Sequence, residues 1–315
     1  MSKTTWIITD GKKGTENQCL GLASSLGLTP TVFQIKPRFP WSLLPPIFWF
    51  FPLIGIKGLP KKEPWPQVLI AASRSASAVA AKIRQLSQGK TLTIFLQNPH
   101  LSPEKFDIVI APSHDQLKGP NVIETLGCLH PVAPKVLEQA YKEHDSLLGA
   151  MNPKKVAILL GGKTRHYQMP VPLLETYATQ LRLLAEKNPI SYMLTASRRT
   201  ETKCLEAFRK GLGETLKFIW DEKGPNPYLG ILAHADIILV TADSVSMISE
   251  AIATGKPVYI LTLKGFSKKL GRFHKDLLEK GIIRFFEGSL ESWSYKIPLQ
   301  TKDIIGRIKA LGSHY

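Results

Sequence analysis

Short runs of hydrophobic residues alternate along the chain with longer segments in which hydrophobic residues recur at a helical period. The runs expected to be strands are 5–9, 31–35, 68–71, 92–96, 107–110 and 122–124, then 156–160, 191–195, 216–219, 237–240 and 258–261. Helices are expected between them, among others at 17–26, 75–86, 133–144, 172–186, 200–211 and 244–253. This alternation is typical of βαβ units, which build parallel sheets. The sequence therefore predicts an α/β protein.

The strands and helices form two series, separated by the expected helix 133–144 and the sequence Met151-Asn152-Pro153. We place a domain boundary near residue 150. Residues 1–150 would form an N-terminal Rossmann-like domain and residues 151–315 a C-terminal one, facing a central cleft in a GT-B-like arrangement. The last expected helix, 302–311, either stays with the second domain or crosses back to the first. In such sheets ligands bind beyond the carboxyl ends of the strands.

The composition of the chain indicates which kind of partner it binds and which cellular compartment it occupies. The formal net charge of +16 divides as +6 over residues 1–150 and +10 over residues 151–315, which favours an anionic partner. No zinc-finger spacing, RNP-like motif or basic heptad pattern occurs, so nucleic acid is not expected. The three cysteines form no CxxC pair, and the first residues show no secretory leader. A cytoplasmic location is therefore predicted.

One uncharged segment, 39–56, indicates a membrane surface as a partner. It contains Trp41, Phe48, Trp49, Phe50 and Phe51, and basic residues precede and follow it. Its four prolines disfavour a continuous membrane-spanning helix. An aromatic wedge between cations suits a loop or short helix that lies in the headgroup region of an anionic membrane. The alternative is a loop packed in the protein interior.

The most specific candidate site follows the expected strand 237–240. Ser244 occupies an expected helix N-cap, and Ser246 lies in the first turn, where backbone amides and the helix dipole favour a diphosphate. Glu250 lies four residues after Ser246 on the same helical face, where its carboxylate could accept both hydroxyls of a ribose. The alternative is an ordinary βαβ unit with a serine cap and a solvated glutamate. The candidate ligands are Asp243, Ser244, Ser246, Met247 and Glu250.

Three further loops in the second half contribute candidates. Gly162, within Leu160-Gly161-Gly162, would let the backbone approach a ligand closely. Ser197 and Arg198 follow the strand 191–195, and arginine suits bidentate contact with phosphate, although surface arginines on a loop are the alternative. Thr200 is expected to cap the next helix. Asn226, in a turn before residues 229–233, could touch a base or a sugar.

The first half offers candidate proton acceptors at its own strand ends. Asp10 and Glu16 lie in the loop 10–18, which contains two glycines and would face an acceptor or a phosphate. His114 follows the strand 107–110 and adjoins Asp115, and histidine titrates near neutral pH. No DxD sequence and no metal-ligand spacing of histidines occurs, so neither a metal nor a cofactor is expected.

Four of these stretches, in order, carry a resemblance. The sequences DGKKGTENQ at 10–18, SRRT at 197–200, NPY at 226–228 and DSVSMISEAIATGKPV at 243–258 resemble the elongated-mitochondria family of mitochondrial-fission proteins, which has many bacterial members. The last stretch also resembles the donor site of GT-B glycosyltransferases, notably the enzyme that makes the lipid-linked peptidoglycan precursor. That resemblance implies a ribose-binding role for Glu250 and a hydrophobic patch that touches the membrane.

The resemblance also includes one departure. Thr15 stands where the family's first motif, DGKxGHxNQ, has a histidine. If that histidine is a base, then Asp10, Glu16 or His114 must replace it. A plant relative is understood as an adaptor that recruits a fission GTPase, so the resemblance does not itself imply an enzyme.

These observations support one leading hypothesis and two alternatives. The leading hypothesis is metal-independent transfer of a sugar from a nucleotide diphosphate-sugar to a membrane-associated acceptor, by a protein bound peripherally to the inner face of the membrane. The first alternative is a non-catalytic, membrane-associated adaptor. The second is a nucleotide-sugar epimerase, which would turn over its substrate without an acceptor.

Overall fold

The computed structural model describes residues 3–151, 154–220, 224–298 and 301–311. It divides the chain into two compact units, one made of residues 1–131 and 299–315 and the other of residues 132–298. The sequence placed a single boundary near residue 150. The difference lies in helix α3 (Pro134–Leu148), which belongs to the second unit. Helix α9 (Thr301–Leu311), for which both domains were left open, belongs to the first unit.

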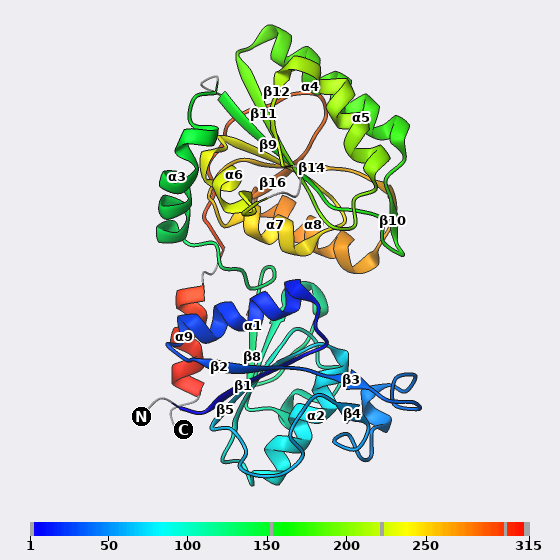
Figure 1. The fold of residues 1–315 in the computed structure, drawn as a ribbon, viewed down its shortest axis with the longest axis vertical. Helices are drawn as coiled ribbons and strands as arrows, with labels where there is room; N and C mark the ends of the chain where they lie inside the picture. Colours follow the sequence, from blue (N-terminus) through cyan, green and yellow to red (C-terminus); the bar gives the residue numbers. More distant parts are fainter. Residues whose placement is uncertain (1–2, 152–153, 221–223, 299–300, 312–315) are drawn as a thin grey trace. The chain divides into compact units, whose positions relative to one another are not determined.

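The first unit contains a six-stranded parallel sheet in the order β2-β1-β5-β6-β7-β8 (Figure 1). These strands span Pro30–Gln34, Thr5–Thr9, Val68–Ala72, Leu92–Leu96, Ile108–Pro112 and Val122–Thr125. The central strands are buried on both faces, which explains their uninterrupted hydrophobic sequences. The hydrophobic runs therefore predicted the strands of this sheet to within a few residues.

Helices cover both faces of this sheet. Helix α1 (Lys13–Ser25) and helix α9 share one core, in which Leu22, Ile304 and Ile308 are buried. Helix α2 (Arg74–Leu86) packs on the opposite face. Beyond the sheet, β3 (Lys36–Pro37) and β4 (Ile56–Lys57) form an antiparallel pair at the base of the segment 39–56, which contains the 3-10 turn η1 (Pro46–Phe48). Two more 3-10 turns, η2 (Pro103–Lys105) and η3 (Ser113–Asp115), flank β7.

The second unit repeats the plan with a parallel sheet in the order β12-β11-β9-β13-β14-β16. These strands span Leu216–Ile219, Ile190–Ala196, Lys154–Leu160, Ile237–Thr241, Val258–Leu261 and Ile283–Phe285. Its helices, besides α3, are α4 (Val171–Lys187), α5 (Thr202–Leu212), α6 (Tyr228–His234), α7 (Val245–Ile252) and α8 (Lys268–Glu279). A 3-10 turn, η4 (Gly213–Thr215), precedes β12, and β10 (Tyr167–Gln168) pairs with β15 (Lys264–Gly265).

Helix α3 joins the second unit because it packs on α6. The ring of Tyr141 stacks on the buried ring of His234, with centroids 4.1 Å apart. Gly230 leaves room for the ring of His144, since a Cβ at that position would overlap it. These contacts link residues about ninety positions apart, so the hydrophobic pattern of 133–144 alone could not assign the helix to a domain.

Each sheet has one topological switch point, where the chain reverses its direction of travel across the sheet. In the first unit this point lies between β1 and β5, and in the second between β9 and β13. Open α/β sheets bind ligands beyond the carboxyl ends of the two strands at such a point. The two switch points are therefore where candidate sites are sought.

Candidate functional site

At the switch point of the second unit, a buried carboxylate holds two glycines in place. The side chain of Asp243 is buried and accepts hydrogen bonds from the hydroxyl of Thr241 (2.7 Å) and the backbone amide of Gly162 (3.0 Å). The amide of Gly161 donates to the hydroxyl of Thr241 (2.7 Å). A Cβ on Gly161 would overlap the carboxylate of Asp243. The glycines thus allow the β9 loop to approach Asp243, a role that the sequence did not suggest for them.

An arginine completes this cluster, and it is Arg199. Its guanidinium donates to the carboxylate of Asp243 (3.1 Å) and to the carbonyl oxygen of Gly162 (3.2 Å). The neighbouring Arg198, the candidate named from the sequence, is exposed. Ser197 accepts a hydrogen bond from the amide of Arg199 through its hydroxyl (3.2 Å). Both arginines are exposed to solvent, and Arg199 in addition joins the loop after β11 to Asp243, which follows β13.

Thr200 does not cap helix α5, contrary to the expectation from the sequence. The N-cap of α5 is Glu201, which makes no side-chain capping hydrogen bond. The hydroxyl of Thr200 instead accepts from the amide of Ser197 (3.0 Å) and donates to the carbonyl oxygen of Gly161. Thr200 thereby closes the loop after β11 onto the loop after β9.

The N-terminus of helix α7 is capped as the sequence predicted. Ser244 is the N-cap, and its hydroxyl accepts a hydrogen bond from the amide of Met247 (3.4 Å). Ser246 and Met247 lie half-buried in the first turn. The remaining first-turn amides have no partner within a helix, and the dipole gives this end partial positive charge. The end of α7 can therefore receive an anionic group.

Glu250 is paired with a tyrosine in the free protein. The hydroxyl of Tyr228 donates to a carboxylate oxygen of Glu250 (2.7 Å). Burial raises the pKa of the Glu250 carboxyl, and the hydrogen bond from Tyr228 opposes that rise. Burial also raises the pKa of the Tyr228 hydroxyl well above its usual range, so this hydroxyl remains a donor. Glu250 is half-buried, and a carboxylate with one hydrogen-bonded partner has lone pairs left for a ligand.

The sequence NPY at 226–228 positions this tyrosine. The side-chain oxygen of Asn226, a candidate ligand, accepts from the amide of Tyr228 (3.0 Å) at the start of α6. At the other end of α6, the ammonium of Lys256 donates to the carbonyl oxygens of Leu232 (2.8 Å) and Ala233 (2.6 Å). Burial lowers the pKa of Lys256 to about 8. The turn 226–228 that contains Tyr228 was expected to touch a base or a sugar, whereas nothing in the sequence indicated that Tyr228 pairs with Glu250 or that Lys256 binds the end of α6.

At the switch point of the first unit there is a cavity of about 360 Å³. Residues that follow three neighbouring strands line it: Asp10 and Lys12 after β1, Ser73 and Arg74 after β5, and Gln97 after β6. The side chain of Lys12 forms an ion pair with Asp10 (2.5 Å). The aromatic wall of the cavity comes from the segment 39–56 through Trp41 and Trp49. The cavity thus combines a carboxylate, two cations and an apolar wall.

Two residues of this cavity have strained backbones. Ser73 has φ 95° and ψ 153°, a region that is populated almost only by glycine, and Gln97 has φ 74°. Both residues lie directly after a buried strand, β5 and β6 respectively. Such strain is found preferentially at ligand sites, where it holds a side chain or an amide in a position that a relaxed loop would not give.

The three proton acceptors proposed from the sequence lie in different surroundings. Asp10 lines the cavity. Glu16, on α1, is buried and accepts from the side chain of Gln34 (2.7 Å), with the ammonium of Lys13 at 3.3 Å. His114 is buried in the turn η3 after β7. Neither Glu16 nor His114 is among the residues that line the cavity, so the structure brings only Asp10 to this site.

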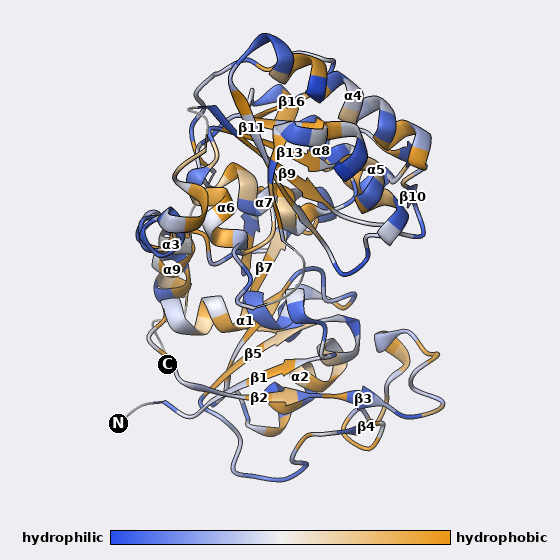
Figure 2. Cartoon of the chain, turned by 45° about the horizontal axis from the view of Figure 1, so that its top comes forward, coloured by the Kyte–Doolittle hydropathy of each residue, from blue (hydrophilic) through white to orange (hydrophobic). Residues whose placement is uncertain are grey.

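The segment 39–56 is anchored from beneath and exposed at its tips. Trp49 is buried in the core that includes α2, and its indole N–H donates to the carbonyl oxygen of Leu44 (3.1 Å). In contrast, Phe39 and Phe50 are each nearly 80% exposed (78% and 79%), and Phe51 is 66% exposed. Figure 2 shows the hydrophobic colouring on the loop between β3 and β4. The segment is therefore both a structural anchor and an exposed apolar surface.

Within the residues that the structure describes, there is neither a membrane-spanning helix nor a cluster of metal-binding side chains. None of the described helices is long and apolar enough to cross a bilayer. Within the same residues, no group of three or more histidine, cysteine, aspartate or glutamate side chains is placed to hold a metal ion.

Two Rossmann-like domains with parallel sheets define the protein as GT-B-like in fold. The structure resembles UDP-GlcNAc 2-epimerase from Methanocaldococcus jannaschii, with a TM-score of 0.58 and 12% identity over 98% of this chain and 100% of that chain. It also resembles MurG from Acinetobacter baumannii, with a TM-score of 0.53 and 12% identity over 98% of this chain and 90% of that chain. At this level of identity the likeness concerns the fold.

The chain belongs to the mitochondrial fission ELM1 family, whose model matches residues 13–309. A relative from Arabidopsis thaliana, mitochondrial fission protein ELM1, is 32% identical over 272 residues, which make up 78% of this chain. The matched region spans 63% of the length of the Arabidopsis protein. The sequence resemblance to this family is thereby confirmed.

Proposed function

We propose that the protein transfers a sugar from a nucleotide diphosphate-sugar to a membrane-associated acceptor without a catalytic metal ion. The observation that carries the proposal is the half-buried, hydrogen-bonded pair of Glu250 and Tyr228 beside the capped N-terminus of α7. Together these features offer a hydrogen-bond acceptor for ribose hydroxyls and a cluster of amides for phosphate, at a topological switch point.

In the proposed donor site, the carboxylate of Glu250 accepts hydrogen bonds from the ribose. Ser246 and the first-turn amides of α7 bind the diphosphate, assisted by the exposed guanidinium of Arg198. Asp243 acts indirectly, because its carboxylate is committed to Gly162, Thr241 and Arg199 and holds the surrounding loops. Asp243 therefore serves in the proposed site as a positioning residue.

The proposed acceptor site is the cavity in the first unit. The carboxylate of Asp10 takes the proton from the acceptor hydroxyl, whose oxygen forms a new bond to the anomeric carbon while the bond from that carbon to the diphosphate oxygen breaks. The helix end and the arginine of the donor site stabilise the negative charge that develops on the leaving diphosphate. The exposed tips of the segment 39–56 hold the protein at the membrane surface, where the acceptor resides.

The proposal is tested by thermal-shift screening of the protein against UDP-, GDP-, ADP- and CMP-sugars. A nucleotide-sugar that binds the folded state raises the melting temperature. We expect Glu250→Gln to abolish that rise. The matched control is Glu175→Gln, on an exposed face of α4, which should leave the rise unchanged. The absence of a shift with every nucleotide-sugar, or an unchanged shift in Glu250→Gln, contradicts the donor site.

A second candidate function is a non-catalytic adaptor at a membrane. Membership of the mitochondrial fission ELM1 family favours it, because the Arabidopsis relative is named for fission rather than for an enzymatic activity. An adaptor predicts that Glu250→Gln and Asp10→Asn both support function in cells, whereas a transferase predicts that each abolishes it. A nucleotide-sugar epimerase, the third possibility, would turn over its substrate with no acceptor present.

A further inference from the structure

The base of the segment 39–56 holds three basic side chains around a shallow hollow. Lys36 on β3 and Lys57 on β4 are directly opposite each other in the antiparallel pair. Arg38 follows β3, and its amide donates to the carbonyl oxygen of Gly55 (2.7 Å), which extends the pairing. These three side chains, with Pro37 and Phe39, line a hollow of about 670 Å³. We call Lys36, Arg38 and Lys57 the stem cations.

The arrangement of the stem cations is unfavourable in the free protein. Like charges directly opposite each other in an antiparallel pair destabilise it. None of the three has an ion-pair partner among the described residues, and the sequence contains no aspartate or glutamate between residues 17 and 62. An anion bound between the stem cations would remove the repulsion. The charge pattern therefore points to a ligand that carries negative charge.

The exposed tips next to this hollow identify the kind of anion. Phe39, Leu43, Phe50 and Phe51 are each about two-thirds exposed or more, and Trp49 and Ile56 hold the loop to the core. A rigid apolar surface of this kind fits a lipid surface or a protein partner. Cations at its base favour the lipid, because in an anionic bilayer phosphate groups lie directly above the hydrocarbon that receives the aromatic tips.

We propose that the stem cations bind the phosphate of an anionic phospholipid while the tips of the segment 39–56 enter the bilayer. This inference rests on the membrane docking included in the proposed function, and it specifies the lipid chemistry that docking requires. The anchored β3–β4 pair presents the cations at one level, so the lipid phosphates set the depth to which the tips insert.

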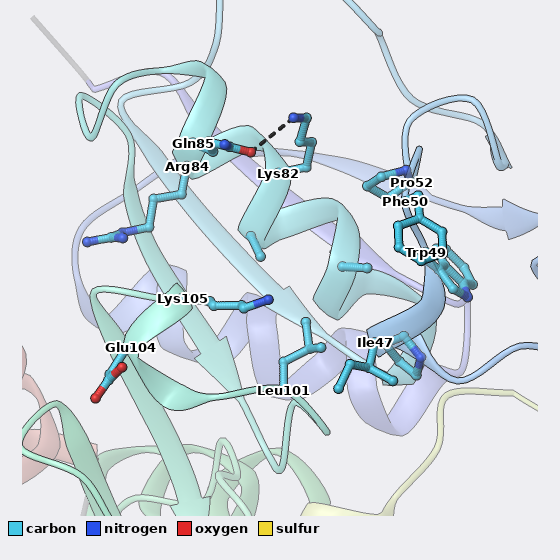
Figure 3. A pocket seen from close by; sticks show the side chains of 13 residues that line it. Ile47, Trp49, Phe50, Pro52, Lys82, Arg84, Gln85, Leu101, Glu104 and Lys105 are labelled. Carbon is cyan, nitrogen blue, oxygen red and sulfur yellow. Dashed lines mark hydrogen bonds between the residues drawn. The ribbon is translucent and has the colours of Figure 1, made fainter.

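A second hollow, of about 470 Å³, adjoins the same segment and provides a contrast (Figure 3). Its basic residues are largely engaged within the protein. The guanidinium of Arg84 is paired with Asp107 (2.8 Å), and the ammonium of Lys82 donates to the side chain of Gln85 (2.9 Å). Glu104 contributes a negative charge to its rim. This hollow therefore attracts a phosphate less strongly than the stem does.

The test is cosedimentation of the full chain with phosphatidylcholine vesicles that contain or lack phosphatidylglycerol. The stem variant is Lys36→Gln/Arg38→Gln/Lys57→Gln. Its matched control, Lys82→Gln/Lys90→Gln/Lys105→Gln, removes the same charge from the same unit. Because each basic side chain near an anionic surface is worth about fivefold in binding, we expect the stem variant to lose roughly a hundredfold with phosphatidylglycerol vesicles. The control should lose less than tenfold.

Three outcomes overturn the proposal. Equal losses in the stem variant and the control would show that only net charge matters. Wild-type binding that does not depend on phosphatidylglycerol would show that the tips act alone, which leaves the proposed docking intact. Competition by free glycerol phosphate as strong as that by vesicles would assign the hollow to a soluble phosphate. A further variant, Phe48→Ser/Phe50→Ser/Phe51→Ser, tests the membrane docking itself and leaves the buried Trp49 in place. If the segment does not dock on membranes, this variant will bind every vesicle as the wild type does.

Discussion

The two units place their candidate sites at equivalent points of similar sheets but stabilise them differently. In the second unit, the loops after β9, β11 and β13 are joined by hydrogen bonds that converge on the buried carboxylate of Asp243. In the first unit, the loops after β1, β5 and β6 surround a cavity, and the segment 39–56 forms one of its walls. Two residues of this cavity, Ser73 and Gln97, have strained backbones. The same fold thus supports one site whose loops are joined by hydrogen bonds without a ligand and one whose loops contain strained residues.

The largest expected effect tests the close packing around Asp243 in the second unit. In Gly161→Ala, the added methyl group would overlap the carboxylate of Asp243. That carboxylate cannot move away, because hydrogen bonds from Thr241 and Gly162 hold it in place. We expect a loss of about 3 kcal/mol in the free energy of unfolding, measured by urea denaturation. The matched change in the first unit is Gly14→Ala in α1, where nothing lies within 4 Å of the added carbon. That change should stabilise by about 0.5–1 kcal/mol because alanine favours helix. Similar changes in the free energy of unfolding for Gly161→Ala and Gly14→Ala would contradict the proposed difference in packing between the two positions.

A comparable effect is expected from pH, through His274 on α8. Burial lowers the pKa of this histidine from 6.5 to about 4, in spite of an opposing interaction with the backbone of Ala242 at the end of β13. Between these values protons bind the unfolded chain more readily than the folded one. Stability is therefore complete above pH 6.5 and falls by about 3 kcal/mol as the pH drops to about 4.

The variant His274→Gln should reduce this pH dependence of the free energy of unfolding in the second unit. The first unit serves as the internal reference, followed by the fluorescence of its tryptophans Trp6, Trp41, Trp49 and Trp65 in a background in which Trp220 and Trp293 of the second unit are replaced by phenylalanine. An unchanged slope of stability against pH in His274→Gln would show that other groups cause the acid sensitivity.

The smallest expected effects come from backbone strain in the site of the first unit and from helix capping in the site of the second unit. Ser73→Gly relieves an unfavourable backbone conformation, and after the entropic cost of glycine we expect the first unit to gain about 1 kcal/mol. Ser244→Ala removes the cap of α7, and we expect the second unit to lose about 1 kcal/mol. Both values come from urea denaturation. A loss in Ser73→Gly would mean that the Ser73 side chain, which lies 3.3 Å from the hydroxyl of Ser75, contributes more than the strain costs.

Local and periodic features of the fold could be predicted from the sequence. Strands of both sheets were recognisable because parallel strands covered on both faces must be hydrophobic throughout. The cap at Ser244 was also predictable, because a capping hydrogen bond spans only three residues. Features that depend on distant partners were not. Nothing near Arg198 and Arg199 indicates which one pairs with Asp243, which is 44 residues away.

Contacts with distant residues also decide which side chains of the segment 39–56 are exposed, so the sequence alone could not show this. Its composition indicated an apolar surface, and five aromatic side chains were equivalent candidates for membrane contact. The structure separates them, because Trp49 packs against the core shared with α2 while Phe48, Phe50 and Phe51 do not. Likewise, the opposition of Lys36 and Lys57 depends on how β3 and β4 pair, and these strands are too short to show a periodic pattern.

Helix α6 has a further consequence for how the family can vary. Its first residue, Tyr228, is tied to Glu250, and its last turn is tied to Lys256. Glu250 and Lys256 both flank the same short stretch of chain, so α6 works as a spacer whose seven residues, about 10 Å, must match a fixed span. One inserted residue would rotate the tyrosine by about 100° and detach it from the carboxylate. The length of this helix is therefore expected to tolerate insertions far less than its outward-facing side chains tolerate substitution.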